Sequence, residues 1–129
     1  MVVYDKRGTG ESPGPINQLQ GRIHDAEAMA QCVSAALPGL PHLAIGHSMG
    51  TVVVARANTV REGTVLLSPL MPKGEQMAAG GPVLMLRGEM DGPGEWEVIK
   101  GADHLLMRDG HLAPEVVTRI LGWEAEVRG

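Results

Sequence analysis

The sequence predicts an α/β fold, with a mostly parallel sheet of about five strands and helices around it. Short apolar runs, each bounded by Gly, Pro or other turn-forming residues, recur along the chain and predict strands. Apolar residues at helical spacing separate several of these runs. Strands that alternate with helices favour a parallel sheet, and a length of 129 residues favours a single domain.

The first half of the chain predicts two strands, each followed at some distance by a helix. Residues 2–4 (VVY) form a β-prone run that leads into a loop rich in Gly and Pro. Over residues 16–37 the apolar positions alternate in steps of three and four, which is typical of an amphipathic helix, and Pro38 ends it. Residues 43–45 then predict a buried strand and residues 48–58 a helix.

The second half predicts three further strands and two helices. The strands are the short apolar runs over residues 64–67, 83–86 and 96–99. A short helical crossover is expected over residues 71–79. Pro114 suits the first turn of a final helix. The apolar face of that helix is expected to contain Val116, Val117, Ile120 and Leu121.

Composition and charge argue against several classes of protein. The chain has a net charge of −4, and no basic stripe indicates a nucleic-acid interface. Cys32 is the only cysteine, so no internal disulfide or cysteine metal cluster can form, and we expect neither a metal nor a cofactor. The N-terminus lacks the apolar segment of a signal peptide, and no apolar run is long enough for a membrane span. We therefore expect a cytoplasmic protein.

A serine between two glycines is the strongest chemical signal. Gly46, His47, Ser48, Met49 and Gly50 fit the pattern G-x-S-x-G after a buried strand and before a helix. In that setting a sharp turn presents the serine hydroxyl at the carboxyl end of the sheet, and both glycines are expected to avoid collisions within the turn. A serine that only caps the helix is the alternative. The strand and helix on either side favour a nucleophile.

A serine nucleophile needs a base and a carboxylate that orients the base. His104 follows the last apolar strand and precedes the final helix, which predicts it as the base. Asp91 follows the fourth strand, so nucleophile, acid and base occur in the order that accompanies this type of turn. His47 lies inside the turn and is expected to point away from Ser48 and to pack.

Four segments together resemble the α/β-hydrolase family. DKRGTGES, over residues 5–12, is similar to the D-x-R-G-x-G-x-S loop of many members, including proline iminopeptidase-like ones. GHSMG is similar to the nucleophile elbow of the family, GEMD to its acid loop and GADH to its histidine loop. The resemblance implies Ser48 as nucleophile, Asp91 as acid, His104 as base and the backbone amide of Met49 as one oxyanion donor.

The chain departs from the family in its length. The given sequence shows no strand before residue 2, so we expect the usual H-G-containing loop, which supplies the second oxyanion donor, to be missing and the cap to be reduced to a short link. The resemblance thus implies a truncated fold, a single minimal domain over residues 1–129 without a cap. We expect residues 2–4 to pair beside residues 43–45 and to bring the following loop over Ser48.

The loop after residues 2–4 then has two possible roles. Its backbone amides at Arg7, Gly8 and Thr9 can replace the missing oxyanion donor, because loss of one donor costs about 10²- to 10³-fold in rate. The alternative is that its polar side chains only tie a tight turn.

The short link after the fourth strand raises a question of topology. A parallel crossover normally needs about 10 to 12 residues, so residues 96–99 can instead form a hairpin, which would carry His104 away from Ser48. We expect the parallel arrangement, because GADH matches the histidine loop of the family well. Three neighbouring carboxylates are the alternatives to Asp91 as the acid: Glu89, Glu95 and Asp103.

The predicted activity is that of a carboxylesterase-like serine hydrolase, which forms an acyl-enzyme with small, short-chain ester-type substrates. One alternative is aminopeptidase or acyltransferase activity on the same residues. Another is a non-catalytic remnant that serves as a binding or interaction module. Right-handed crossovers leave only the final helix for one face of the sheet, so a partly bare apolar face predicts a homodimer or higher oligomer.

Overall fold

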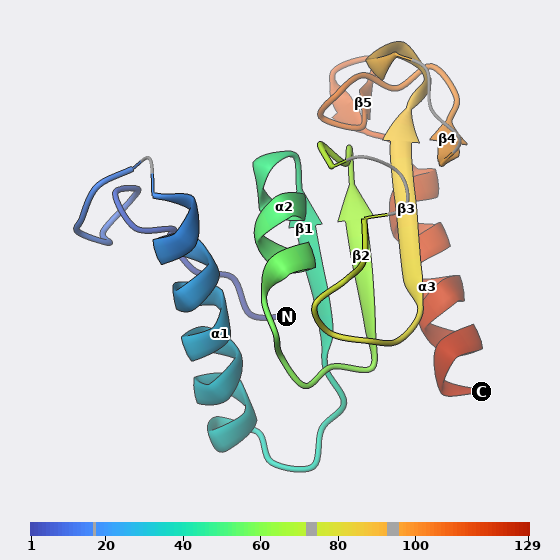
Figure 1. The fold of residues 1–129 in the computed structure, drawn as a ribbon. Coiled ribbons are helices and arrows are strands. Elements are labelled where there is room, and N and C mark those ends of the chain that lie inside the picture. Colours follow the sequence, from blue (N-terminus) through green and yellow to red (C-terminus); the bar gives the residue numbers. More distant parts are fainter. Residues whose placement is uncertain (17, 72–74, 93–95) are drawn as a thin grey trace.

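A parallel sheet of four strands organises the protein (Figure 1). The computed structural model describes residues 1–16, 18–71, 75–92 and 96–129. Within these residues the four strands lie side by side in chain order. They are β1 (Leu43–His47), β2 (Gly63–Leu67), β3 (Val83–Gly88) and β4 (Glu97–Ile99). The predicted α/β class with a parallel sheet is confirmed, with four strands in place of about five.

Helices cover both faces of this sheet. In the described part of the chain they are α1 (Leu19–Ala36), α2 (Met49–Arg56) and α3 (Pro114–Arg128). Side chains of β2 alternate between the faces, so that Val65 packs in the cluster of α3 and Leu66 in that of α2. α1 lies outside α2 and forms a buried cluster with it around Ile23 (Figure 1). None of the helices in the described residues combines the length and apolar character of a membrane span.

The prediction that residues 2–4 pair with β1 is wrong. They form no strand, and Val2 and Val3 keep 54% and 78% of their surface exposed. The loop that follows is held elsewhere, because Arg7 donates two hydrogen bonds of 2.7 Å to the Asp25 carboxylate on α1. These bonds lower the pKa of Asp25. With the loop anchored on α1, β1 remains an edge strand.

The short link between β3 and β4 leads into a parallel strand, which excludes the hairpin. β4 pairs only with the last three residues of β3, with Leu86 opposite Glu97 and Gly88 opposite Ile99. The chain therefore returns by only about 7 Å along the strands, at roughly 3.3 Å per residue. Among the described residues of this link, Glu89–Asp91 form a single 3₁₀ turn.

The prediction of a helical crossover over residues 71–79 is wrong for the residues of this range that the structure describes. Residues 72–74 lie outside the described part of the chain, and residues 71 and 75–79 are not helical. This link lies against α2 instead, where the amide of Ala78 donates to the carbonyl oxygen of Ala55 over 2.8 Å.

A small antiparallel hairpin that was not predicted from the sequence follows the histidine loop. Its strands are β5 (Met107–Arg108) and β6 (His111–Leu112). Asp109 and Gly110 join them with φ values of 54° and 80°. Positive φ at both central residues is typical of a type I′ turn, which favours Asp-Gly. That dipeptide was the available signal, since strands of two residues are too short to show alternation.

α3 contacts the sheet through a stripe that shares Val116 and Ile120 with the predicted one. Its contact residues are Val116, Ile120, Trp123 and Val127. Val117 and Leu121, which were expected on this face, are 48% and 58% exposed. Trp123 is only 6% exposed and lies over Gly63, where an added Cβ would come within 2.6 Å of the indole ring. The missing side chain of Gly63 therefore lets Trp123 dock α3 on β2.

Trp123→Ala is expected to lower the free energy of unfolding by about 3–5 kcal/mol, because it removes a buried aromatic ring and leaves a cavity. Urea denaturation followed by far-UV circular dichroism measures this change. Leu121→Ala on the same helix is the control and is expected to stay within about 0.5 kcal/mol of the wild type, because Leu121 is largely exposed. Equal losses for the two variants would contradict the docking of α3 through Trp123.

Candidate active site

Ser48 lies in the turn between β1 and α2, at the carboxyl end of β1. Its amide donates to the carbonyl oxygen of Leu67 over 2.9 Å, which extends the β1–β2 ladder by one residue. Its φ of 55° and ψ of −118° form a combination that residues with a side chain rarely adopt. Such strain persists only where the surroundings enforce it, and it is typical of functional positions.

The two glycines of the turn do different things. A Cβ on Gly46 would overlap the carbonyl oxygen of Gly50 and lie 2.7 Å from its carbonyl carbon. A Cβ on Gly50 would meet no atom within 4 Å. The expectation that both positions must lack a side chain therefore holds at Gly46 and is wrong at Gly50.

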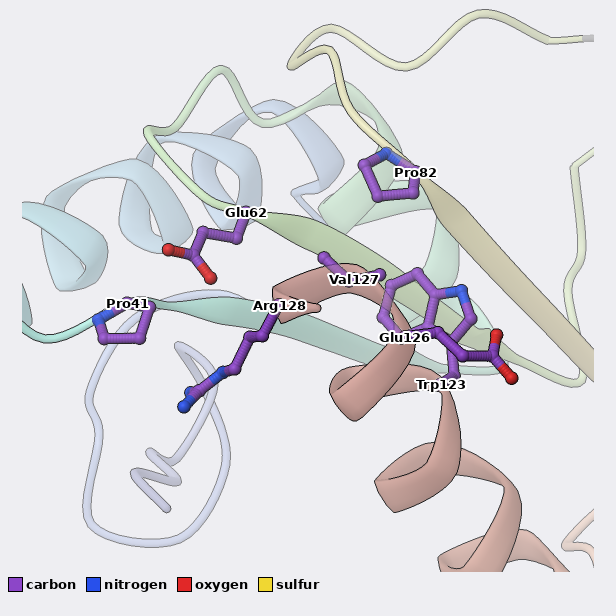
Figure 2. A pocket seen from close by; sticks show the side chains of 7 residues that line it. All are labelled: Pro41, Glu62, Pro82, Trp123, Glu126, Val127 and Arg128. Carbon is purple, nitrogen blue, oxygen red and sulfur yellow. The ribbon is translucent and has the colours of Figure 1, made fainter.

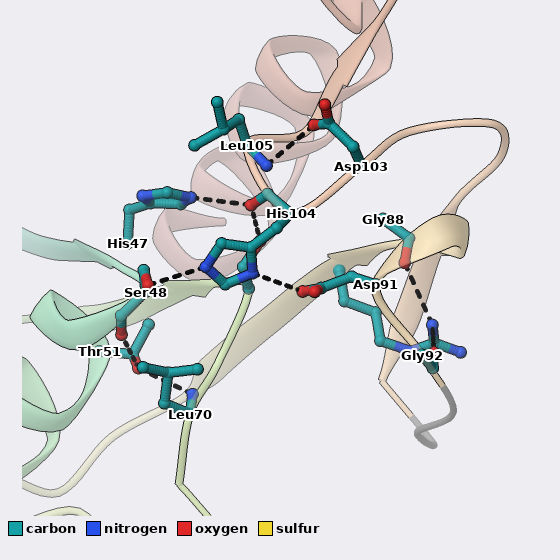
Figure 3. A network of polar contacts seen from close by, with 12 residues as sticks. His47, Ser48, Thr51, Leu70, Gly88, Asp91, Gly92, Asp103, His104 and Leu105 are labelled. Atoms are coloured by element: carbon teal, nitrogen blue, oxygen red, sulfur yellow. Dashed lines mark hydrogen bonds and ion pairs between the residues drawn. The ribbon is translucent and has the colours of Figure 1, made fainter.

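Three predicted side chains meet in one hydrogen-bonded chain (Figure 3). Ser48 Oγ lies 2.8 Å from His104 Nε2, and Asp91 Oδ2 lies 2.8 Å from His104 Nδ1. A carboxylate oxygen only accepts, so Nδ1 carries the proton and Nε2 is free to accept from the serine hydroxyl. The three residues follow β1, β3 and β4, whose carboxyl ends share one edge of the sheet.

The alternative acids have other positions. Glu89 accepts a backbone amide of the loop before His104 over 3.2 Å. Asp103 accepts two amides of its own turn, over 2.9 and 3.0 Å. Glu95 lies outside the described residues. Of the four candidates, Asp91 is the carboxylate that the described structure places on the His104 ring.

Three residues with no predicted role of this kind hold the hydrogen-bonded residues Ser48 and His104 in place. His47 was expected to pack, but it is exposed, and its Nε2 lies 3.0 Å from the main-chain oxygen of His104. The Ser68 hydroxyl donates to the same oxygen over 2.6 Å. The Thr51 hydroxyl donates to the main-chain oxygen of Ser48 over 2.5 Å. For Ser68, its position in the sequence could have indicated a role at the site, because it directly follows β2 as Ser48 follows β1.

The amides predicted to stabilise an oxyanion differ in their surroundings. Met49 is the first residue of α2, so its amide has no partner within the helix. The amides of Gly8 and Thr9 donate to carbonyl oxygens of their own loop, over 3.1 and 2.9 Å. The side chain of Arg7 holds that loop on α1. These contacts support the alternative that the loop ties a tight turn, and they do not support its role as a replacement donor.

The cavity in Figure 2 lies at the opposite end of the sheet and is not part of this site. Its volume is about 660 Å³. Its walls are residues that precede three of the strands and residues of the last turns of α3, namely Pro41, Glu62, Pro82, Trp123, Glu126, Val127 and Arg128. Among the described residues, no group of three or more His, Cys, Asp or Glu could hold a metal ion.

Comparison with known proteins indicates one family. Residues 1–92 match the family described as serine aminopeptidase, S33. The chain is also similar to the solved structure of an alpha-beta serine hydrolase homologue from Coxiella burnetii, with a TM-score of 0.64 and 23% identity. This match covers 90% of the chain and 64% of that homologue, and at this identity it shows the fold alone. No curated protein matches the chain.

Proposed function

The chain belongs to the serine aminopeptidase S33 family of α/β-hydrolases, and on this basis we propose that it is a serine hydrolase for small, short-chain esters. One observation carries the proposal. Ser48 has a strained backbone directly after β1, and its hydroxyl is linked to His104 and, through the His104 ring, to Asp91 by two contacts of 2.8 Å.

In this proposal Ser48 Oγ attacks the ester carbonyl carbon while His104 Nε2 takes the hydroxyl proton. The tetrahedral intermediate collapses, the alcohol leaves with the proton from His104, and an acyl-enzyme remains on Ser48. His104 then takes a proton from water as the water oxygen attacks the acyl carbon. The second tetrahedral intermediate collapses, His104 returns the proton to Ser48 Oγ, and the acid leaves. The Asp91 carboxylate keeps the ring in the required tautomer and stabilises the imidazolium in both steps.

We propose the amide of Met49 as one oxyanion donor. It stands at the first position of α2, where helix amides point outward without a partner and the helix dipole favours negative charge. An oxyanion formed at the carbonyl attacked by Ser48 develops next to this amide.

The exposure of the site supports small substrates and broad selectivity. The side chain of His104 is 40% exposed and that of Asp91 is 26% exposed, so the base and acid are reached from solvent. We therefore propose acetyl and other short acyl esters as the preferred class.

Aminopeptidase activity on the same residues is the second candidate, because the matched family is described by that activity. An aminopeptidase has to pair the ammonium group of its substrate with an acidic or carbonyl oxygen. Side-by-side assays with p-nitrophenyl acetate and alanine p-nitroanilide distinguish the two activities. Faster turnover of the anilide would replace the esterase proposal by the aminopeptidase one.

A fluorophosphonate probe tests the nucleophile directly. Labelling of the wild type is expected, Ser48→Ala is expected to abolish it, and His104→Ala to slow it by at least about 1,000-fold. Ser34→Ala is the matched control, because Ser34 also lies near a histidine, with its Oγ 3.4 Å from His42 Nδ1, and should label like the wild type. A folded wild type that is not labelled would replace this proposal by a non-catalytic binding module.

A further inference from the structure

The main-chain oxygen of His104 has two partners apart from the reacting groups. His47 Nε2 lies 3.0 Å away (Figure 3), and Ser68 Oγ lies 2.6 Å away. A carbonyl oxygen only accepts hydrogen bonds and offers two lone pairs, so both neighbours must donate. This fixes the proton of a neutral His47 on Nε2, whereas the contact with Asp91 fixes that of His104 on Nδ1.

Ser68 occupies a position on β2 that corresponds to that of Ser48 on β1. Each residue directly follows its strand and has a positive φ, 51° for Ser68 and 55° for Ser48. Each amide extends the sheet ladder by one residue, Ser68 to Leu86 over 2.7 Å and Ser48 to Leu67 over 2.9 Å. Ser68 is fully buried, so its hydroxyl has no access to water as an alternative partner. The strained backbone thus directs two neighbouring hydroxyls at one histidine, one at its ring and one at its main chain.

We propose that His47 and Ser68 are positioning residues, which hold the main chain of His104 so that Nε2 stays within reach of Ser48. This inference rests on the proposed serine hydrolase function. His47 precedes Ser48 in the chain, so its ring ties the elbow directly to the histidine loop. In this proposal His104 therefore keeps its position relative to Ser48 when the elbow or the histidine loop moves.

These hydrogen bonds to the main chain matter because the His104 side chain is 40% exposed and is not held by packing in the core. Its ring hydrogen-bonds Ser48 and Asp91 and lies 5.5 Å from the His47 ring between centroids, tilted by 45°. Asp91 itself lies on a short turn outside the strands. A displacement of about 1 Å at a reacting group can cost about 100-fold in rate. The anchoring of the main chain then decides how accurately the imidazole is placed.

Histidine tautomers give a test that does not depend on catalysis. Long-range ¹H–¹⁵N NMR at mildly alkaline pH, assigned with His47→Gln and His104→Ala, is expected to show the proton of His47 on Nε2 and that of His104 on Nδ1. The Nδ1 proton of His104 should exchange with water faster in Ser68→Gly than in the wild type. Ser68→Gly removes the hydroxyl but tolerates the positive φ, so this variant keeps the backbone. A His47 proton on Nδ1, or unchanged exchange in Ser68→Gly, would overturn the proposal.

Two His47 variants separate the hydrogen bond from the ring. Gln can place an N–H near the position of histidine Nε2, whereas Asn reaches only the position of Nδ1. We expect fluorophosphonate labelling of His47→Gln to remain close to the wild type. Labelling of His47→Asn and of Ser68→Gly should fall by about tenfold, the rate equivalent of one hydrogen bond.

Equal labelling of the two His47 variants would overturn the positioning role. Thermal unfolding of each variant identifies any loss that comes from unfolding alone, and such a loss also counts against the proposal. If the folded wild type is not labelled, the hydrolase function fails, and the two NMR measurements still decide whether His47 and Ser68 hold the main chain of His104.

Discussion

Gly46→Ala is expected to lower fluorophosphonate labelling by about 100-fold or more and to destabilise the fold by about 1–3 kcal/mol. A methyl group at residue 46 would overlap the carbonyl oxygen of Gly50, which is backbone and cannot rotate away. Relief requires a shift of the first turn of α2. That turn carries the amide of Met49 and enforces the positive φ of Ser48. Labelling rates and urea denaturation measure the two effects.

Gly50→Ala is the matched control, with the same added methyl group on the other side of Ser48. A Cβ there meets nothing within 4 Å. Within a helix Ala is also favoured over Gly by about 0.8–1.0 kcal/mol. This variant is therefore expected to label like the wild type and to be equally or more stable. Loss of labelling in Gly50→Ala together with normal labelling in Gly46→Ala would contradict the packing seen in the elbow.

The parts of the fold that local pattern controls were predictable. The strands β1, β2 and β3 and the helix α2 follow from short apolar runs and from helical spacing. Burial on both faces of a parallel sheet favours such runs, most clearly in β2 and β3. Residues 2–4 carry the same type of pattern, yet they form no strand. The ion pair of Arg7 with Asp25 anchors the adjoining loop on α1, and no period in the sequence shows such a long-range contact.

In the candidate site, too, the residues that lie in motifs were predictable and those that act through backbone contacts were not. Ser48, Asp91 and His104 were predictable, because each lies in a short motif that follows a strand. The roles of His47 and Ser68 were not, since both contact a main-chain oxygen that any residue at position 104 would offer. The sequence also left a hairpin open as the alternative to the parallel pairing of β4 with β3, because that pairing depends on a register of only three residue pairs.

Asp91→Asn is expected to slow labelling by about 10⁴-fold at neutral pH while the protein stays folded. An amide N–H facing His104 Nδ1 would make that nitrogen an acceptor and move the ring proton to Nε2. The ring could then no longer accept the Ser48 proton. The turn itself should survive, because the Arg87 guanidinium donates to the carbonyl oxygens at both of its ends, Gly88 and Gly92.

Glu89→Gln makes the same chemical change on the same 3₁₀ turn and serves as the control. The Glu89 carboxylate accepts a backbone amide over 3.2 Å, and the side-chain oxygen of Gln can accept that bond equally well. Its labelling rate is therefore expected to stay close to that of the wild type. A large loss in Glu89→Gln with normal labelling in Asp91→Asn would assign the acid to Glu89. Both carboxylates lie on one turn, so this pair of variants distinguishes the carboxylate that orients the His104 ring, Asp91, from the one that only accepts a backbone amide of its loop, Glu89.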